Sequence, residues 1–165
     1  MDAMVASGNA TASATTPIHH KADIMNNSYS WAVHHGLQPG DRVLTHKSFF
    51  GIVKHHSLYV GMDTEWNAWV IENVAGEGVR WTRLDKLIQR NGHITSIERY
   101  CGTEYQRTAV VNQALARIGM PYDALSYNCE HFVNDVLYGR RKSNQVEVFG
   151  GLAALVLAVV VVRNL

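Results

Sequence analysis

The sequence lacks an excess of charge, a cysteine framework and a secretion signal, and each absence excludes a class of protein. Fifteen lysines and arginines against 14 aspartates and glutamates give a net charge of +1, which argues against a nucleic-acid binder. Two cysteines, Cys101 and Cys129, are too few for a disulfide scaffold or a cysteine-built zinc module. Residues 1–4 show no basic-then-apolar signal, so we expect a protein on the reducing side of a membrane.

Hydrophobic residues make up 47% of the 165 residues, which is enough for one compact domain with modest tails. Residues 1–37 are expected to form a flexible extension, although 17–37 contains apolar residues that could dock on the domain. The folded domain is expected at 38–139. A basic linker at 140–147 and a hydrophobic segment at 148–162 follow it.

Short runs rich in valine, isoleucine, tyrosine and tryptophan predict an antiparallel meander in the first half of the domain. The second half instead places its apolar residues at helical spacing. Strands followed by helices predict an α+β domain in which the helices pack on one face of the sheet. The predicted strands are 42–46, 51–61, 68–74, 78–82 and 94–100, and the predicted helices are 84–89, 105–118 and 128–138.

The hydrophobic segment 148–162 contains no charged residue and is bracketed by the basic residues 140–142 and by Arg163. As a helix it would be roughly 22 Å long, short of the roughly 30 Å hydrocarbon core of a bilayer. One interpretation is a helix buried in the protein. We favour a single C-terminal membrane anchor, because the run is apolar all round and arginine side chains can snorkel to the headgroups. The basic linker then predicts that the folded domain faces the cytoplasm.

The strongest local signal for chemistry is Cys129, which lies within SYNCEHFV at 126–133. It falls in the first turn of the predicted helix, after the capping candidates Ser126 and Asn128. The amides and dipole of a helix start stabilise a thiolate, which is the reactive form of cysteine. We therefore interpret Cys129 as a nucleophile rather than an inert buried thiol, whereas Cys101 has no such context.

A thiol nucleophile needs a base, and the sequence offers nine histidines. Most lie before the domain, in loops or at a strand end, and His131 is only two positions from Cys129, so it points to another face of the helix. His55 and His56 lie inside the predicted strand 51–61, where alternation places them on opposite faces. The face with His55 also carries serine and tyrosine, which suits a polar site. No cysteine or histidine stands at ligand spacing beside this pair, so we expect no metal.

Two sequence boxes resemble those of the lecithin:retinol acyltransferase (LRAT) family in the NlpC/P60 superfamily. HHSLYVG at 55–61 is similar to the family's His-x-x-x-Tyr-[Val/Leu]-Gly box, and NCEHF at 128–132 matches its second box residue for residue. Further agreement runs through YG at 138–139 and SNQV at 143–146, and the whole resemblance covers about residues 38–162. The arrangement is most similar to the H-rev107-like phospholipase A/acyltransferases. This resemblance implies the circularly permuted papain-like fold with a C-terminal hydrophobic helix.

The resemblance also implies residue roles and no cofactor. Cys129 would attack an ester carbonyl and form a thioester. His55, which stands four residues before Tyr59, would act as the general base and then as the general acid. Backbone amides at the helix start, beside Asn128, would stabilise the oxyanion.

The chain departs from the family at the third polar residue. Where the family commonly has a second histidine, this sequence has Glu72, with Asn73 one step away. A carboxylate can orient an imidazole and stabilise its charged form, as the third member of a catalytic triad does. Glu72 is therefore the expected orienting group and Asn73 the alternative. The remaining interpretation is that Glu72 is a surface charge on an edge strand.

These observations predict a membrane-tethered thiol acyltransferase or phospholipase A1/A2-type hydrolase that acts on phospholipid acyl esters. The expected partners are the lipid substrate and a membrane bound through 148–162, with no nucleic acid, and the chain is expected to be a monomer. One alternative is an NlpC/P60-like cysteine peptidase or amidase acting on cell-wall peptides. Another is a non-enzymatic interaction protein, because picornaviral H-box/NC proteins share both boxes.

Overall fold

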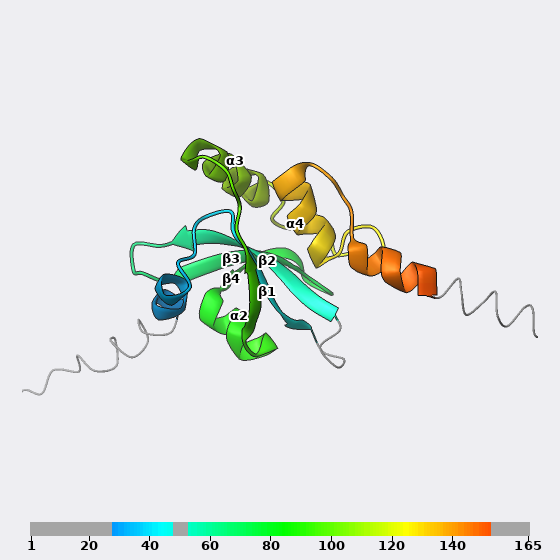
Figure 1. The fold of residues 1–165 in the computed structure, drawn as a ribbon, viewed down its shortest axis with the longest axis horizontal. Helices are drawn as coiled ribbons and strands as arrows, with labels where there is room; N and C mark the ends of the chain where they lie inside the picture. Colours follow the sequence, from blue (N-terminus) through cyan, green and yellow to red (C-terminus); the bar gives the residue numbers. More distant parts are fainter. Residues whose placement is uncertain (1–27, 48–52, 153–165) are drawn as a thin grey trace, which may run out of the picture.

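The computed structural model describes residues 28–47 and 53–152, and its centre is one antiparallel sheet. The strands follow the order β4-β3-β2-β1-β5, so that β1, β2 and β3 are inner strands and β4 and β5 form the edges (Figure 1). Each strand overlaps a predicted one. Their bounds are β1 Arg42–Lys47, β2 Val53–Met62, β3 Ala68–Val74, β4 Gly78–Arg83 and β5 Ile94–Glu98.

Between residues 84 and 138 the described chain forms the three predicted helices, with ends shifted by up to three residues. They are α2 Leu84–Asn91, α3 Glu104–Leu115 and α4 Cys129–Tyr138. Thr103 begins α3 with a capping box, in which side chains satisfy the first free amides of the helix. Gly139 ends α4 at φ 64°, a left-handed conformation that glycine adopts without a steric penalty.

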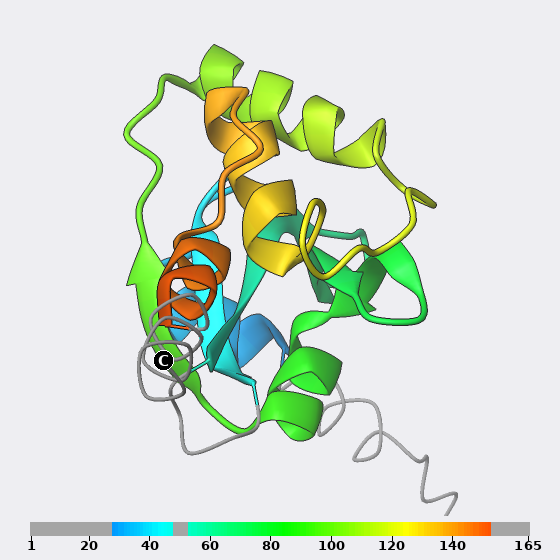
Figure 2. The ribbon, with the colours of Figure 1, turned by 90° about the vertical axis from the view of Figure 1, so that its right-hand side faces the viewer.

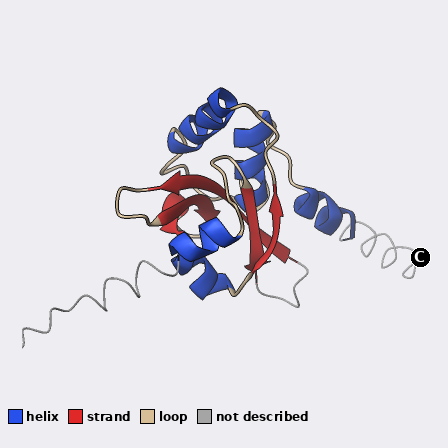
Figure 3. Ribbon diagram, turned by 60° about the vertical axis from the view of Figure 1, so that its left-hand side comes forward, coloured by secondary structure: helices blue, strands red, loops and turns tan. Residues whose placement is uncertain are grey.

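The helices cover both faces of the sheet, which corrects the prediction that they pack on one face. Leu58 and Ile71 belong to the core under α3 and α4, whereas Tyr59 and Val70 belong to the core under α2 and the helical residues 28–34. Figures 1 and 3 show α3 and α4 on one side of the strands and α2 on the other. The reason is that β2 and β3 carry buried apolar residues on both faces, and each face therefore needs a cover.

The folded unit begins earlier than predicted. Residues 28–34 form a helix in which Ala32 is buried, and Ser28 Oγ accepts a hydrogen bond from the amide of Ala68 at 3.2 Å. Ala32, with Trp31 and Leu37 partly buried beside it, thus docks this part of the expected extension on the domain, while Tyr29 and Val33 stay exposed. Residues 1–27 of that extension lie outside the described residues.

A further helical stretch, 144–152, follows α4 and lies at the side of the domain (Figure 2). Ser143 caps it, because its buried hydroxyl accepts the amide of Val146 at 3.3 Å and donates to Glu130 at 2.7 Å. The first residues of the expected anchor belong to this helix, and 153–162 lie outside the described residues. No helix in the described part of the chain is both long and apolar enough to cross a membrane. The anchor therefore stays a prediction.

The sheet opens at one end between the neighbouring strands β2 and β3. β2 stays paired with β1 back to its first residue, Val53, and β3 stays paired with β4 to its last residue, Val74. The ladder between β2 and β3 instead ends at Ser57 and Glu72. The part of β2 that carries His55 therefore diverges from the end of β3, and α4 packs against both strands.

Gly78, at the start of β4, occupies a position that tolerates no side chain. Its φ is +76°, and a β-carbon there would lie 2.4 Å from the carbonyl oxygen of Met120. We expect Gly78→Ala to lower the free energy of unfolding by about 2–4 kcal/mol, because the left-handed backbone and the clash both oppose alanine. Gly76→Ala is the matched control, since its φ is +82° with nothing within 4 Å. Urea unfolding should show a clearly smaller loss for the control, and equal losses would contradict the role of the clash.

Candidate active site

The start of α4 fixes the position of Cys129. Asn128 Oδ1 accepts hydrogen bonds from the amides of Glu130 and His131 at 2.9 and 3.1 Å, and His131 Nδ1 accepts one from the amide of Asn128 at 3.3 Å. This capping box makes Cys129 the first helical residue, with 3% of its surface exposed. Its predicted place in the first turn is confirmed. Helix amides and the helix dipole there favour the thiolate over the thiol.

Asn73 holds the loop before α4 against the end of β3. Its Nδ2 donates to the carbonyl oxygens of Tyr127 and Asn128, at 2.6 and 3.5 Å. Its Oδ1 is buried and has no hydrogen-bond partner among the described residues. The alternative prediction, in which Asn73 orients His55, is therefore wrong. Asn73 instead positions the chain that leads into Cys129.

His55 lies between Cys129 and Glu72. Its Nε2 is 2.6 Å from Glu72 Oε2, and its imidazole is also hydrogen bonded to Cys129. Because Glu72 occupies Nε2, Nδ1 is the ring nitrogen left for the thiol. Burial lowers the pKa of His55, but the hydrogen bonds and charges of Cys129 and Glu72 outweigh it, so the pKa is raised above 6.5. The surroundings thus favour a protonated imidazole beside a thiolate.

Glu72 is fully buried on an inner strand, so its interpretation as an edge-strand surface charge is wrong. Thr82 Oγ1 and Arg90 Nη2 each donate to its carboxylate at 2.5 Å, and Arg80 Nη2 donates at 3.4 Å. Burial raises the pKa of Glu72. The hydrogen bonds from His55 and Arg90 outweigh burial and lower the pKa to about 2. The carboxylate is therefore ionised and held from several sides.

His56 points away from this line of contacts, as strand alternation predicts. Its Nε2 lies 3.2 Å from Gln145 Nε2. Burial and the charge of Arg42 lower the pKa of His56 to about 4, so this imidazole is neutral at physiological pH. Of the adjacent pair, only His55 has a carboxylate and Cys129 as hydrogen-bond partners.

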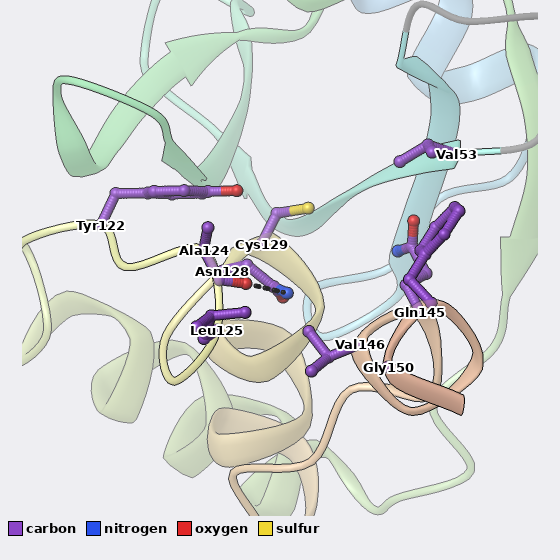
Figure 4. Close-up of a pocket in the computed structure, with 10 residues that line it drawn as sticks. Val53, Tyr122, Ala124, Leu125, Asn128, Cys129, Gln145, Val146 and Gly150 are labelled. Carbon is purple, nitrogen blue, oxygen red and sulfur yellow. Dashed lines mark hydrogen bonds between the residues drawn. The ribbon is translucent and has the colours of Figure 1, made fainter. Parts of the chain in front are cut away.

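Cys129 lines a pocket of about 390 Å³ that lies beside the start of α4. The loop before α4, the start of β2 and the helix 144–152 form its walls, which are mainly apolar. Figure 4 shows the Cys129 sulfur between Tyr122, whose hydroxyl end points toward it, and Gln145 on the other side. The apolar residues in these walls include Val53, Leu125, Val146 and Phe149.

A buried polar cluster fastens the helix 144–152 to α4. Glu130 accepts hydrogen bonds from the Ser143 hydroxyl at 2.7 Å and from the amide of Gln145 at 3.1 Å. Asn128 Nδ2 donates to Ser143 Oγ at 3.3 Å. One wall of the pocket is thus tied directly to the residues that flank the thiol.

The structure brings Cys129, His55 and Glu72 together from α4, β2 and β3. Asn128 lines the same pocket, but its side chain is used in capping. Sequence reasoning assigned no role to two further polar residues of the pocket, Tyr122 and Gln145. The SNQV motif was a signal for Gln145, and nothing in the local sequence pointed to Tyr122.

A thiol, an imidazole and an ionised carboxylate in this order can carry out nucleophilic attack on a carbonyl group. The thiol supplies the nucleophile, and the imidazole exchanges the proton. Among residues 28–47 and 53–152, no three histidine, cysteine or acidic side chains gather in a way that could hold a metal ion.

Comparison with known proteins identifies the family to which the chain belongs. No curated protein sequence matches it significantly. Residues 21–153 match the family described as permuted papain-like amidase enzymes, YaeF/YiiX, C92, and this span contains both His55 and Cys129. The match supports a papain-like, NlpC/P60-type protein and not the LRAT or H-rev107 groups specifically. The chain belongs to the permuted papain-like amidase family C92.

Proposed function

We propose that the protein is a cysteine hydrolase that cleaves an acyl group from an amide or ester through a thioester on Cys129. The observation that carries this proposal is the buried line of contacts from Cys129 through His55 to Glu72. Membership of an amidase family supports amide bonds as the first substrates to test.

In the acylation step, the Cys129 thiolate attacks the carbonyl carbon and the carbonyl oxygen becomes an oxyanion. The protonated His55 then gives its proton to the departing amine or alkoxide, which leaves an acyl thioester on the sulfur. In the second step His55 takes a proton from water, and the resulting hydroxide attacks the thioester. The carbon–sulfur bond then breaks, so that the acid is released and the Cys129 thiolate is restored beside the protonated His55.

The oxyanion in both steps needs hydrogen-bond donors that face the developing charge. Asn128 is not the side-chain donor, because its Nδ2 already donates to Ala124 and Ser143. The backbone amide of Cys129, at the start of α4, is the main-chain donor in this proposal. The Tyr122 hydroxyl, which points toward the sulfur, is the side-chain donor (Figure 4).

A phospholipid acyl ester is a second candidate substrate, and the apolar pocket favours it. Leu125, Val146 and Phe149 line the space beside the thiol, where an acyl chain of several carbons would bury apolar surface. Val148 and Leu152 expose further apolar surface on the helix 144–152, which also carries Val146 and Phe149. With water as the acceptor in the second step, this activity would be that of a phospholipase. An alcohol or amine in place of water would make it an acyltransferase.

The test compares N-acyl amides, p-nitrophenyl acyl esters and phosphatidylcholine vesicles as substrates of the full chain. Intact-protein and peptide mass spectrometry then search for an acyl group on Cys129. We expect an acyl adduct at this residue with at least one of the three substrates. Release of free acid indicates hydrolysis, and an acylated amine or alcohol indicates transfer. Absence of both adduct and product across pH 5–9 would reject an enzymatic role.

Filling the pocket should discriminate against long acyl chains. We expect Val146→Trp to lower kcat/KM for a dodecanoyl ester by about tenfold or more, because each excluded methylene forfeits burial, while an acetyl ester changes less than about threefold. Val148→Trp is the control, since Val148 lies on the same helix but is 59% exposed. A parallel loss for both chain lengths would show that the pocket does not bind the acyl group.

A further inference from the structure

A second pocket, separate from the one that contains Cys129, lies at the far end of β2. It has a volume of about 550 Å³ and mainly apolar walls. Val60, in its wall, stands five positions after His55 along β2, which is roughly 17 Å of extended strand. The lining residues are Val60, Gly61, Met62, Asp63, Trp69 and Trp81.

Two indole rings form adjoining walls of this pocket. The ring centroids of Trp69 and Trp81 lie 6.1 Å apart, and their planes meet at 88°. The Trp69 ring is fixed by its Nε1–H, which donates to Asp63 Oδ2 at 2.9 Å, and Trp81 is 45% exposed. Indole faces carry partial negative charge, so two of them at right angles attract a cation that can contact both.

Asp63 places a negative charge in the pocket wall, and both of its carboxylate oxygens already accept hydrogen bonds. Its carboxylate accepts hydrogen bonds from the amides of Glu65 and Asn67, from the Asn67 side chain and from Trp69. Hydrogen bonds from Trp69 and Asn67 lower the pKa of Asp63 to about 2, so the group stays ionised. A cation with N–H donors would compete for oxygens that are already used. A cation without N–H groups forms no hydrogen bond and is attracted by the negative charge of Asp63 alone.

Arg83 lies opposite Trp69 in the ladder between β3 and β4, so its positive charge is close to the pocket. Its Nε and Nη2 donate to the carboxylate of Asp85 at 2.9 and 2.6 Å. Asp85 therefore matches the charge of Arg83. The charge of Asp63 also contributes to the raised pKa of Arg83, but less than that of Asp85, and Asp63 is the carboxylate that lines the pocket.

We propose that this pocket binds a trimethylammonium group, which pairs a positive charge with an apolar surface and carries no N–H. Its methyl groups contact the apolar walls and indole faces, while Asp63 supplies the counter-charge. The group could belong to free choline or to a phosphatidylcholine headgroup, since both present the same chemistry. The inference stands independently of any chemistry at Cys129.

Choline and 3,3-dimethylbutan-1-ol have nearly the same shape, but carbon replaces the charged nitrogen in the alcohol. Titration of the full chain with each, followed by tryptophan fluorescence, isolates the effect of charge. We expect saturable choline binding in the millimolar range and about five- to tenfold weaker binding of the alcohol. Equal binding of both compounds would overturn the proposal and leave an apolar pocket only.

Trp81→Leu keeps an apolar wall but removes one indole, and we expect it to weaken choline binding at least fivefold. Trp66→Leu is the matched control, because Trp66 is a 55% exposed tryptophan that does not line the pocket. It should change the affinity less than twofold. Equal effects of the two variants would place the binding elsewhere and overturn the proposal.

Vesicles distinguish the two sources of the group. Flotation with phosphatidylcholine vesicles, using phosphatidylglycerol vesicles as the reference, is compared for the wild type and Trp81→Leu. A loss of phosphatidylcholine binding in the variant assigns the headgroup. If vesicle binding is unchanged while choline binding is lost, the free solute is assigned. If neither depends on Trp81, the proposal fails. Cys129→Ala should leave all of these affinities unchanged.

Discussion

Cys129→Ala is expected to reduce acyl hydrolysis by about 10⁴-fold or more, to the level of the uncatalysed background, while the fold stays intact. The variant removes the atom that forms the thioester, and no other thiol can replace it in the pocket because Cys101 is exposed elsewhere. The measurement is the initial rate on the best amide or ester substrate. Circular dichroism verifies the fold.

Cys101→Ala is the matched control for this experiment and should retain full activity. Cys129→Ser is informative as well, because a serine hydroxyl at the same position is a far weaker nucleophile beside the same imidazole. Residual activity of Cys129→Ala above one tenth of the wild type would refute the thioester mechanism. If the inactive variants kept their full biological effect, the protein would instead act as a non-enzymatic interaction protein, which is the alternative considered from the sequence.

The local pattern of the chain was sufficient to predict its elements but not how they are layered. Alternation and helical spacing located the strands β1 to β5 and the helices α2 to α4 because these periods are local properties. The covering of both faces was missed, since β2 and β3 carry apolar residues on alternate sides and the pattern does not show which helix covers which side. The helix at 28–34 was missed for a related reason. It is held by tertiary contacts such as the burial of Ala32.

The candidate site shows the same division between local and long-range information. The helix start predicted the place of Cys129, and strand alternation separated His55 from His56. The surroundings of Glu72 could not be predicted, because Thr82 and Arg90 come from β4 and α2 and reach the carboxylate only through strand register and helix packing. The opening of the sheet between β2 and β3, which admits the start of α4, is likewise a property of the assembled ladder.

Glu72→Gln is expected to lower kcat/KM by about 10²- to 10³-fold, and its effect on pH dependence identifies the cause. Glutamine keeps the size and one carbonyl oxygen for Thr82 or Arg90 but carries no charge. Burial lowers the pKa of His55, whereas Cys129 and Glu72 raise it. Removing the charge of Glu72 therefore lowers the pKa of His55 relative to the wild type.

A lower pKa of His55 has a defined consequence for the thiol. At neutral pH a smaller fraction of His55 is protonated, so the imidazolium that stabilises the Cys129 thiolate is present less often. Alkylation of Cys129 by iodoacetamide at pH 7 should become slower. The full alkylation profile should shift toward alkaline pH, where the thiol ionises without a neighbouring cation. This readout reports ionisation directly and does not depend on the identity of the substrate.

Glu77→Gln is the control, because Glu77 also pairs with Arg80 but is exposed and makes no contact with His55. It should leave both the hydrolysis rate and the alkylation profile unchanged. If Glu72→Gln slowed hydrolysis while its alkylation profile coincided with that of the wild type, Glu72 would serve only to support β3. A shifted profile together with a reduced rate instead requires that the buried carboxylate acts on Cys129 through the imidazole of His55.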